Sequence, residues 1–105
     1  MTGRRRPMQR IGDLIPDAAR RLGLEDELRL ARAEATWASL VAERVPAAAG
    51  QCRLVRVLRD AILVEVDHPI VAQELRLRST ELLAAFRGAP GGVPASELRV
   101  TVRHA

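Results

Sequence analysis

The segment from Leu54 to Leu75, LVRVLRDAILVEVDHPIVAQEL, constrains the fold more than any other part of the chain. It begins with two aliphatic runs on either side of Arg59–Asp60, which predicts two antiparallel strands joined by a tight turn. Pro69 follows the second run, and proline is favoured in the first turn of a helix because its missing N–H costs nothing there. Asp67 or His68 is the expected cap of that helix. The segment therefore predicts a strand–turn–strand–helix unit.

The two predicted strands present two different faces, because side chains alternate along a strand. One face is aliphatic and is predicted to form the core: Val55, Val57, Ile62 and Val64. The other face mixes large apolar and charged residues: Leu54, Arg56, Leu58, Leu63 and Glu65. Large apolar side chains on a sheet face indicate that something covers it, either the first helix of the chain or a partner protein. Leu54, Leu58 and Leu63 are therefore the candidate partner-binding residues.

Two helices are predicted before the hairpin. The first covers residues 14–22, with Asp13 as its cap and Gly23 at its end, where glycine readily adopts the left-handed conformation. The second covers residues 25–44 and ends before Pro46.

The second of these helices carries two apolar rows. One row is expected to face the core: Leu30, Ala33, Trp37, Leu40 and Val41. The neighbouring row is mostly small and would allow another backbone to approach closely: Leu28, Ala31, Ala35 and Ala38. Trp37 is the expected structural anchor of the core, and a binding hot spot is the alternative.

One helix and one strand are predicted after the hairpin. The helix covers residues 69–87 and ends at Gly88, with this inward stripe: Val71, Leu75, Leu82 and Phe86. Glu74 is expected to pair with Arg78 one turn later. The sequence GAPGGVPAS then predicts a loop. In the last strand apolar residues alternate with polar ones, which gives one buried and one basic face: Leu98, Val100 and Val102 against Arg99, Thr101 and Arg103.

All basic side chains except histidine are arginines. Lys and Arg together number 17, none of them Lys, against 13 Asp and Glu, for a formal net charge of +4. GC-rich coding accounts for the exclusive use of arginine, but guanidinium groups bind phosphates well, and a small basic domain favours nucleic acid as a partner. The candidate nucleic-acid contacts lie at the N-terminus and on the basic strand face: Arg4, Arg5, Arg6, Arg10, Arg56, Arg99 and Arg103.

The length of 105 residues fits one small domain. Residues 1–10 hold four arginines and no acid, which predicts a basic flexible arm, and residues 11–105 are predicted to form a single domain. Only Trp37 and Phe86 are aromatic, so the core must be mainly aliphatic. No apolar run approaches the roughly 20 residues of a membrane span, and no signal peptide is recognisable. We expect a cytoplasmic protein with no membrane partner.

The sequence offers no catalytic, metal-binding or cofactor-binding constellation. Its single cysteine, Cys52, and its two histidines, His68 and His104, match no zinc spacing. Neither a GxxxxGK[ST] loop nor a GxGxxG motif is present. Asp67 beside His68 is better explained by helix capping than by acid–base chemistry. We therefore expect a protein that is not an enzyme and that has no cofactor and no small-molecule substrate.

The order of motifs resembles the DciA family of bacterial partners, or loaders, of the replicative DNA helicase. The segments that carry the resemblance are ATWASLVAERV around Trp37, ILVEV in the hairpin, VAQEL at the helix start and ELRVTVR in the last strand. It extends over about residues 11–103. The resemblance implies an α+β fold similar to a KH domain, with three helices packed on a three-stranded sheet in the order α-α-β-β-α-β. The GXXG loop with which KH domains clamp nucleic acid lies between two helices, and no such loop is predicted here.

The resemblance also implies a function. We expect a noncatalytic module that interacts with the replicative helicase and assists its loading or activation on DNA, with nonspecific DNA contacts made by arginines. Two alternatives remain: a general KH-like RNA- or ribosome-associated factor, and a structural adaptor that does not bind nucleic acid.

Overall fold

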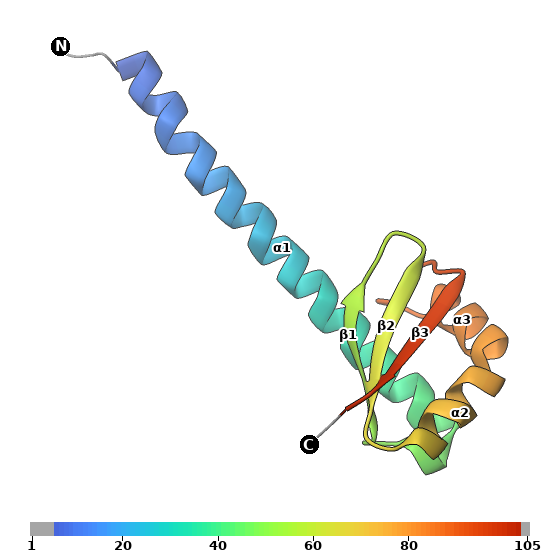
Figure 1. The fold of residues 1–105 in the computed structure, drawn as a ribbon. Coiled ribbons are helices and arrows are strands. Elements are labelled where there is room, and N and C mark those ends of the chain that lie inside the picture. The colour runs from blue at the N-terminus through green and yellow to red at the C-terminus, as the bar shows by residue number, and fades with distance from the viewer. Residues whose placement is uncertain (1–5, 104–105) are drawn as a thin grey trace.

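The computed structural model describes residues 6–103, and it describes side chains from residue 16 onward. These residues form three α-helices and a three-stranded sheet (Figure 1). In chain order the elements are α1 (Arg6–Arg44), the short 3-10 helix η1 (Pro46–Ala48), β1 (Cys52–Val57), β2 (Ala61–Val66), α2 (Pro69–Leu77), α3 (Ser79–Gly88) and β3 (Glu97–Val102). The predicted α+β class, with three helices and three strands, is confirmed. The helices are divided differently along the chain, because one precedes the hairpin and two follow it.

α1 is one continuous helix, whereas the sequence predicted two. The predicted start at Asp13 and the predicted end at Gly23 are wrong, since both positions lie inside the helix. Gly23 costs about 1 kcal/mol relative to alanine, and Pro16 removes one backbone hydrogen bond. The surrounding sequence AARRLGLEDELRLARAE is so rich in strong helix formers that the helix continues through both positions. The predicted end at Arg44 is confirmed.

The sheet has the strand order β1-β2-β3, with β1 antiparallel and β3 parallel to the central strand. The helices α2 and α3 make the connection between the two parallel strands. The aliphatic residues of β3 pair in register with three buried residues of β2: Leu98 with Ile62, Val100 with Val64, and Val102 with Val66. This register confirms that the apolar face of the last strand turns toward the core.

The hairpin residues do not divide between the two faces as predicted. The pairing shifts between Leu54 and Arg56, which is the signature of a β-bulge. Leu54 pairs with Val64 and is only 2% exposed, whereas Val55 and Val57 are 41% and 39% exposed. The prediction that Val55 and Val57 belong to the core is therefore wrong, because simple alternation assumes a strand without an extra residue. Ile62 and Val64 are buried as predicted.

The predicted third helix is divided at Arg78 into α2 and α3. The N–H of Arg78 donates to the carbonyl oxygens of Glu74 and Leu75, each at 3.2 Å, and its own backbone then leaves the helical conformation. The predicted ion pair is confirmed, since Arg78 Nε lies 2.6 Å from Glu74 Oε2. The predicted side-chain cap is wrong, because neither Asp67 nor His68 caps α2 through its side chain; the carbonyl oxygen of His68 accepts from Val71 and Ala72 instead.

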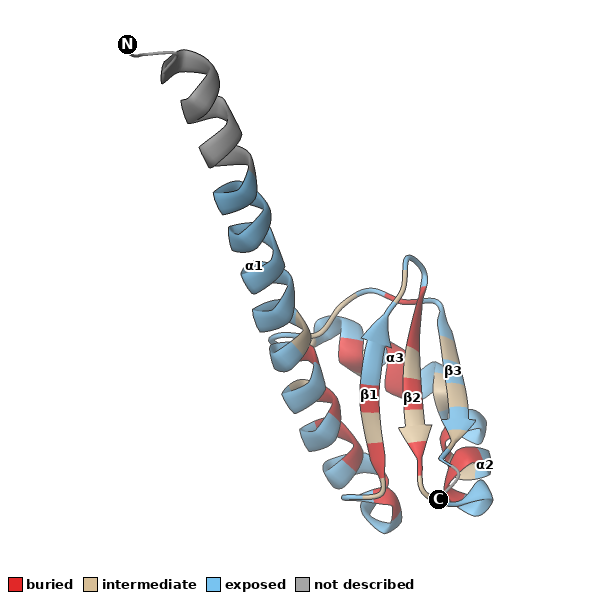
Figure 2. Ribbon diagram, turned by 60° about the vertical axis from the view of Figure 1, so that its left-hand side comes forward, coloured by how far each residue is buried: buried red, intermediate tan, exposed pale blue. Residues whose placement is uncertain are grey.

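The core lies between the helices and one face of the sheet, as the buried residues in Figure 2 show. Trp37 of α1 and Phe86 of α3 are fully buried and meet edge to face, with ring centroids 5.5 Å apart and planes at 87°. Such a pair is worth roughly 1 kcal/mol beyond the apolar area that it buries. The prediction that Trp37 anchors the core is thus confirmed. The row Ala31, Ala35 and Ala38, predicted to allow a close backbone approach, is exposed within the described chain.

Candidate nucleic-acid interface

The outward face of the sheet brings two of the predicted arginines together. The register pairs Arg56 of β1 with Leu63 of β2, and Leu63 with Arg99 of β3. Arg56 and Arg99 therefore flank Leu63, with their backbones about 10 Å apart, which is twice the usual distance between strands. Arg103 follows β3 directly, and its backbone N–H donates to the carbonyl oxygen of Val66 at 2.7 Å.

Acidic side chains neutralise part of this face. Arg53 Nη2 contacts Asp67 Oδ1 at 2.9 Å and Glu65 Oε1 at 3.3 Å. The hydrogen bond between Arg53 and Asp67 is the main cause that raises the pKa of Arg53 and lowers the pKa of Asp67. Arg99 in turn lies 3.3 Å from Glu97. Arg53 is thus held by two carboxylates, and Arg99 is held by one.

Arg56 and Arg103 are the exposed arginines of this face that form no ion pair with another described residue. Arg56 also borders a hollow where α1 leaves the domain, and Arg29 of α1 borders the same hollow. The hollow is lined by Asp26, Arg29, Leu30, Val55, Arg56, Val57 and Val93. Arg29 lies 3.6 Å from Asp26, so Arg56 is the arginine of this hollow that has no ion pair among the described residues.

The remaining predicted arginines belong to the N-terminal segment. Arg4 and Arg5 lie outside the described residues. Arg6 and Arg10 are in the first turns of α1, and their side chains lie outside the described part of the chain. Their contact with phosphate stays a prediction.

The three leucines that were predicted to bind a partner differ in how far they are buried. Leu54 belongs to the buried core cluster, so the prediction that it contacts a partner is wrong. The bulge after Leu54 explains the error, since it changes which residues of β1 face the helices. Leu58 and Leu63 are half-buried.

Sequence reasoning missed the most exposed apolar side chains. Leu22, Leu24 and Leu28 on α1 are 62%, 59% and 55% exposed, and Ile70 and Leu77 on α2 are both 75% exposed. The first three lie where α1 projects away from the sheet (Figure 1). The sequence did not indicate this exposed surface because it predicted that a helix ends at Gly23. A short helix ending there could have folded back on the domain and covered these leucines.

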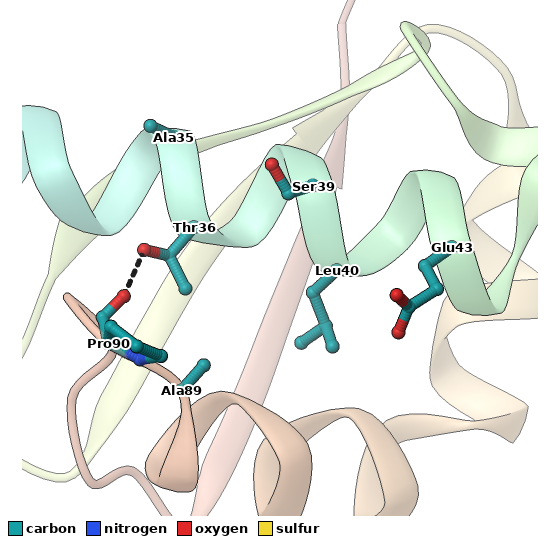
Figure 3. A pocket seen from close by; sticks show the side chains of 7 residues that line it. All are labelled: Ala35, Thr36, Ser39, Leu40, Glu43, Ala89 and Pro90. Atoms are coloured by element: carbon teal, nitrogen blue, oxygen red, sulfur yellow. Dashed lines mark hydrogen bonds between the residues drawn. The ribbon is translucent and has the colours of Figure 1, made fainter.

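A second hollow lies where α1 meets the loop after α3 (Figure 3). The hydroxyl of Thr36 donates to the carbonyl oxygen of Pro90 at 2.6 Å, which ties this loop to α1. Gly91 has a φ of 85°, and a Cβ there would stand 2.6 Å from Thr36 Oγ1. The other lining residues are Ala35, Ser39, Leu40, Glu43 and Ala89. One carboxylate among hydroxyl and apolar groups suits a structural contact better than a reaction.

Cys52 has the surroundings of a structural cysteine. It is buried, and burial raises the pKa of its thiol. A hydrogen-bonding contact with Trp37 lowers the same pKa, but by less than burial raises it. That contact is weak, because the indole Nε1 of Trp37 has no partner at good hydrogen-bond geometry. A buried neutral thiol is a poor nucleophile. Among the described residues, no group of three His, Cys, Asp or Glu side chains is arranged to hold a metal ion.

The junction between α2 and α3 is where a KH domain would carry its GXXG loop. Here a single residue, Arg78, separates the two helices, and the sequence Leu77–Thr80 contains no glycine. The structure therefore lacks a clamp of that kind at this junction. No helix of the described chain is long and apolar enough to cross a membrane.

These features define a small α+β domain with arginines on the outward face of its sheet and a projecting helix. The chain matches the family described as Dna[CI] antecedent, DciA, over residues 10–100, and it belongs to the DciA family. This membership supports a role related to helicase loading in DNA replication, in general terms. A search of curated proteins finds no match.

Proposed function

We propose that this chain is a noncatalytic cytoplasmic module that binds the replicative DNA helicase, assists its loading or activation on DNA, and contacts DNA through the outward face of its sheet. Family membership supports the helicase part of the proposal. The observation that carries the DNA part is the pair Arg56 and Arg99 on either side of Leu63, on a sheet face that no described helix covers.

The DNA contact is made to phosphates and not to bases. Base stacking needs an exposed aromatic ring or a free guanidinium plane. Both aromatic residues of the chain, Trp37 and Phe86, are fully buried, so neither ring can stack on a base, and we assign the unpaired guanidinium groups of Arg56 and Arg103 to phosphates. Phosphate contacts are nonspecific in sequence and weaken steeply as salt increases.

The helicase contact needs exposed apolar side chains, since these supply most interface energy. Ile70 and Leu77 are seven residues apart and therefore share one face of α2. Both are 75% exposed, well above the half-buried Leu58 and Leu63. We assign the helicase contact to this face of α2, with Leu58 and Leu63 as secondary candidates.

The DNA contact is tested with Arg56→Ala and Arg99→Ala together, in the full chain. Each lost phosphate contact should reduce the slope of log affinity against log salt by about 1, so the slope should fall by about 2. Fluorescence anisotropy with a labelled oligonucleotide over a salt series measures this slope. The matched control is Arg87→Ala on α3, which removes an exposed arginine from another surface. If Arg87→Ala lowered the slope as much per arginine removed as the Arg56 and Arg99 pair does, the effect would be one of net charge alone. That result would remove the sheet face from the proposal.

The helicase contact is tested by copurification after nuclease treatment. Ile70→Asp with Leu77→Asp should abolish recovery of the helicase, whereas Leu22→Asp, a change of a leucine on α1 that is 62% exposed, should not. Recovery of ribosomal material instead would favour the RNA- or ribosome-associated alternative. Recovery of neither, with no DNA binding, would favour the structural adaptor.

A further inference from the structure

α1 carries a second apolar stripe on the side turned away from the core. We call it the outer stripe, and all its members are exposed: Leu24, Leu28, Ala31, Ala35, Ala38 and Ala42. Leu24 and Leu28 are 59% and 55% exposed. Successive members are alternately four and three residues apart, which is the a and d spacing of a coiled-coil heptad.

The members of the outer stripe stay exposed, although Ala35 borders the hollow between α1 and the loop after α3. With Leu28 at position a, Trp37 falls at position c, and Ala33 and Leu40 fall at position f, on the side of the helix opposite the seam. Ala33, Trp37 and Leu40 all belong to the buried core, and so does Val41, which falls at position g beside the seam. A helix that paired along the outer stripe would therefore meet α1 from the side away from the domain.

The charged residues beside the outer stripe are complementary to their own copies. In a parallel two-stranded coiled coil, position g of one helix contacts position e of the partner, five residues further on. Arg20 at g would then face Glu25 of the second copy, and Glu27 at g would face Arg32 of the second copy. Both pairs are of opposite sign, and symmetry makes each of them twice.

We propose that two copies of this chain associate through the outer stripe of α1 as a parallel two-stranded coiled coil. An antiparallel arrangement is disfavoured because it brings g positions together, and Glu27 would then face Glu34. Among the side chains that the structure describes, Arg20 is engaged only by Asp17 at 3.7 Å, and both side chains are more than half exposed. Arg20 is therefore available to a second copy.

The composition of the outer stripe sets the strength of this dimer. Two leucines followed by four alanines allow the helices to approach closely but bury little apolar area. The interface lies at the small end of specific protein interfaces, so the dimer forms and dissociates with protein concentration. A dimer would present two basic sheet faces to one DNA molecule and strengthen binding through effective concentration.

Sedimentation of the full chain over a concentration series tests the association. The wild type should shift from monomer to dimer as concentration rises, and Leu28→Asp should remain monomeric. Leu22→Asp is the matched control, because Leu22 is 62% exposed on the same helix but lies outside the outer stripe. A wild type that stays monomeric at all concentrations, or equal behaviour of the two variants, would overturn the proposal.

Charge reversal tests the orientation of the two helices. Glu27→Arg should weaken the dimer by roughly tenfold, since two attractive pairs become repulsive, and Arg32→Glu should do the same. The double variant should regain wild-type association. In an antiparallel dimer Glu27→Arg would strengthen association by relieving the repulsion from Glu34, so that result would overturn the parallel arrangement.

An introduced cysteine gives an independent readout. In a parallel, in-register dimer each Ala35 meets its own copy, so Ala35→Cys should form an intermolecular disulfide under mild oxidation. Leu22→Cys should not, and the buried Cys52 does not interfere. Crosslinking through position 22 but not 35 would contradict the outer stripe as the seam.

Discussion

The two halves of α1 are both helical, but they have opposite environments. In the C-terminal half, Ala33, Trp37 and Val41 are essentially unexposed against the sheet and α3. In the N-terminal half, residues 16–29 are all exposed, with Leu22 at 62%. The difference shows that α1 forms a helix both where it is buried against the domain and where it is not. Helix propensity extends well beyond the point where the domain can cover the helix.

The largest difference between the two halves is expected in the free energy of unfolding when one apolar side chain in each half is truncated. Trp37→Ala should lower the free energy of unfolding by about 3–5 kcal/mol, because it opens a cavity and removes the contact with Phe86. Leu22→Ala should change it by less than about 0.5 kcal/mol, because the side chain is not buried. Urea denaturation followed by circular dichroism measures both values. A cost of several kcal/mol for Leu22→Ala would mean that the projecting half is part of the folded core.

Two glycine substitutions test how much the loop after α3 contributes to holding the C-terminal half of α1. Gly91→Ala combines an unfavourable positive φ with a clash against Thr36, whereas Gly50→Ala introduces the same kind of strain at φ 76° with no neighbour within 4 Å. Gly50→Ala should cost about 1–2 kcal/mol, the price of the left-handed conformation alone. Gly91→Ala should cost clearly more. Equal losses, measured by thermal unfolding, would show that the contact between this loop and α1 contributes nothing.

A smaller effect is expected at Gly23 in the projecting half. Gly23→Ala should increase helix content, because alanine is about 1 kcal/mol better than glycine in a helix interior. The midpoint of domain unfolding should hardly move, since residue 23 makes no contact with the sheet. Far-UV circular dichroism and thermal unfolding of the same sample compare the two quantities. A marked rise in the midpoint would couple the two halves of α1.

The smallest effect concerns the ion pair on the sheet face. Arg53 lowers the pKa of Asp67, so this pair stabilises the folded state at pH values above the ordinary pKa of aspartate. The stabilisation should disappear as pH falls from there through the lowered pKa. Asp67→Asn should flatten this part of the stability curve, measured by urea denaturation between pH 2 and about pH 6. An unchanged curve would show that the pair is energetically neutral, as many exposed pairs are.

Much of the fold follows from patterns that the sequence displays directly. The strand pair, the inward residues of the last strand, Trp37 as the anchor and the ion pair of Glu74 with Arg78 all depend on local periodicity, and the structure has all of them. Local rules failed where a competing effect decided the outcome. At Gly23 the neighbouring helix formers outweighed the glycine, and at Leu54 a bulge reversed the faces of the strand.

The candidate site was predictable only in part for the same reason. Register places Arg56 and Arg99 beside Leu63, and strand alternation was sufficient to group them. The capture of Arg53 by Asp67 and Glu65 depends on side-chain geometry across two strands and a loop, which no sequence pattern specifies. The exposed face of α2 depends on where the chain turns at Arg78.

The burial of Trp37 makes the protein its own fluorescent probe. It is the only tryptophan in the chain, it is shielded from water, and it lies on the half of α1 that is docked to the sheet. Its emission should therefore report whether this half of α1 is in place. The same signal should be insensitive to events at the outward sheet face or on the projecting half of the helix. Undocking of α1 can thus be followed separately from the binding of DNA, without attaching a dye.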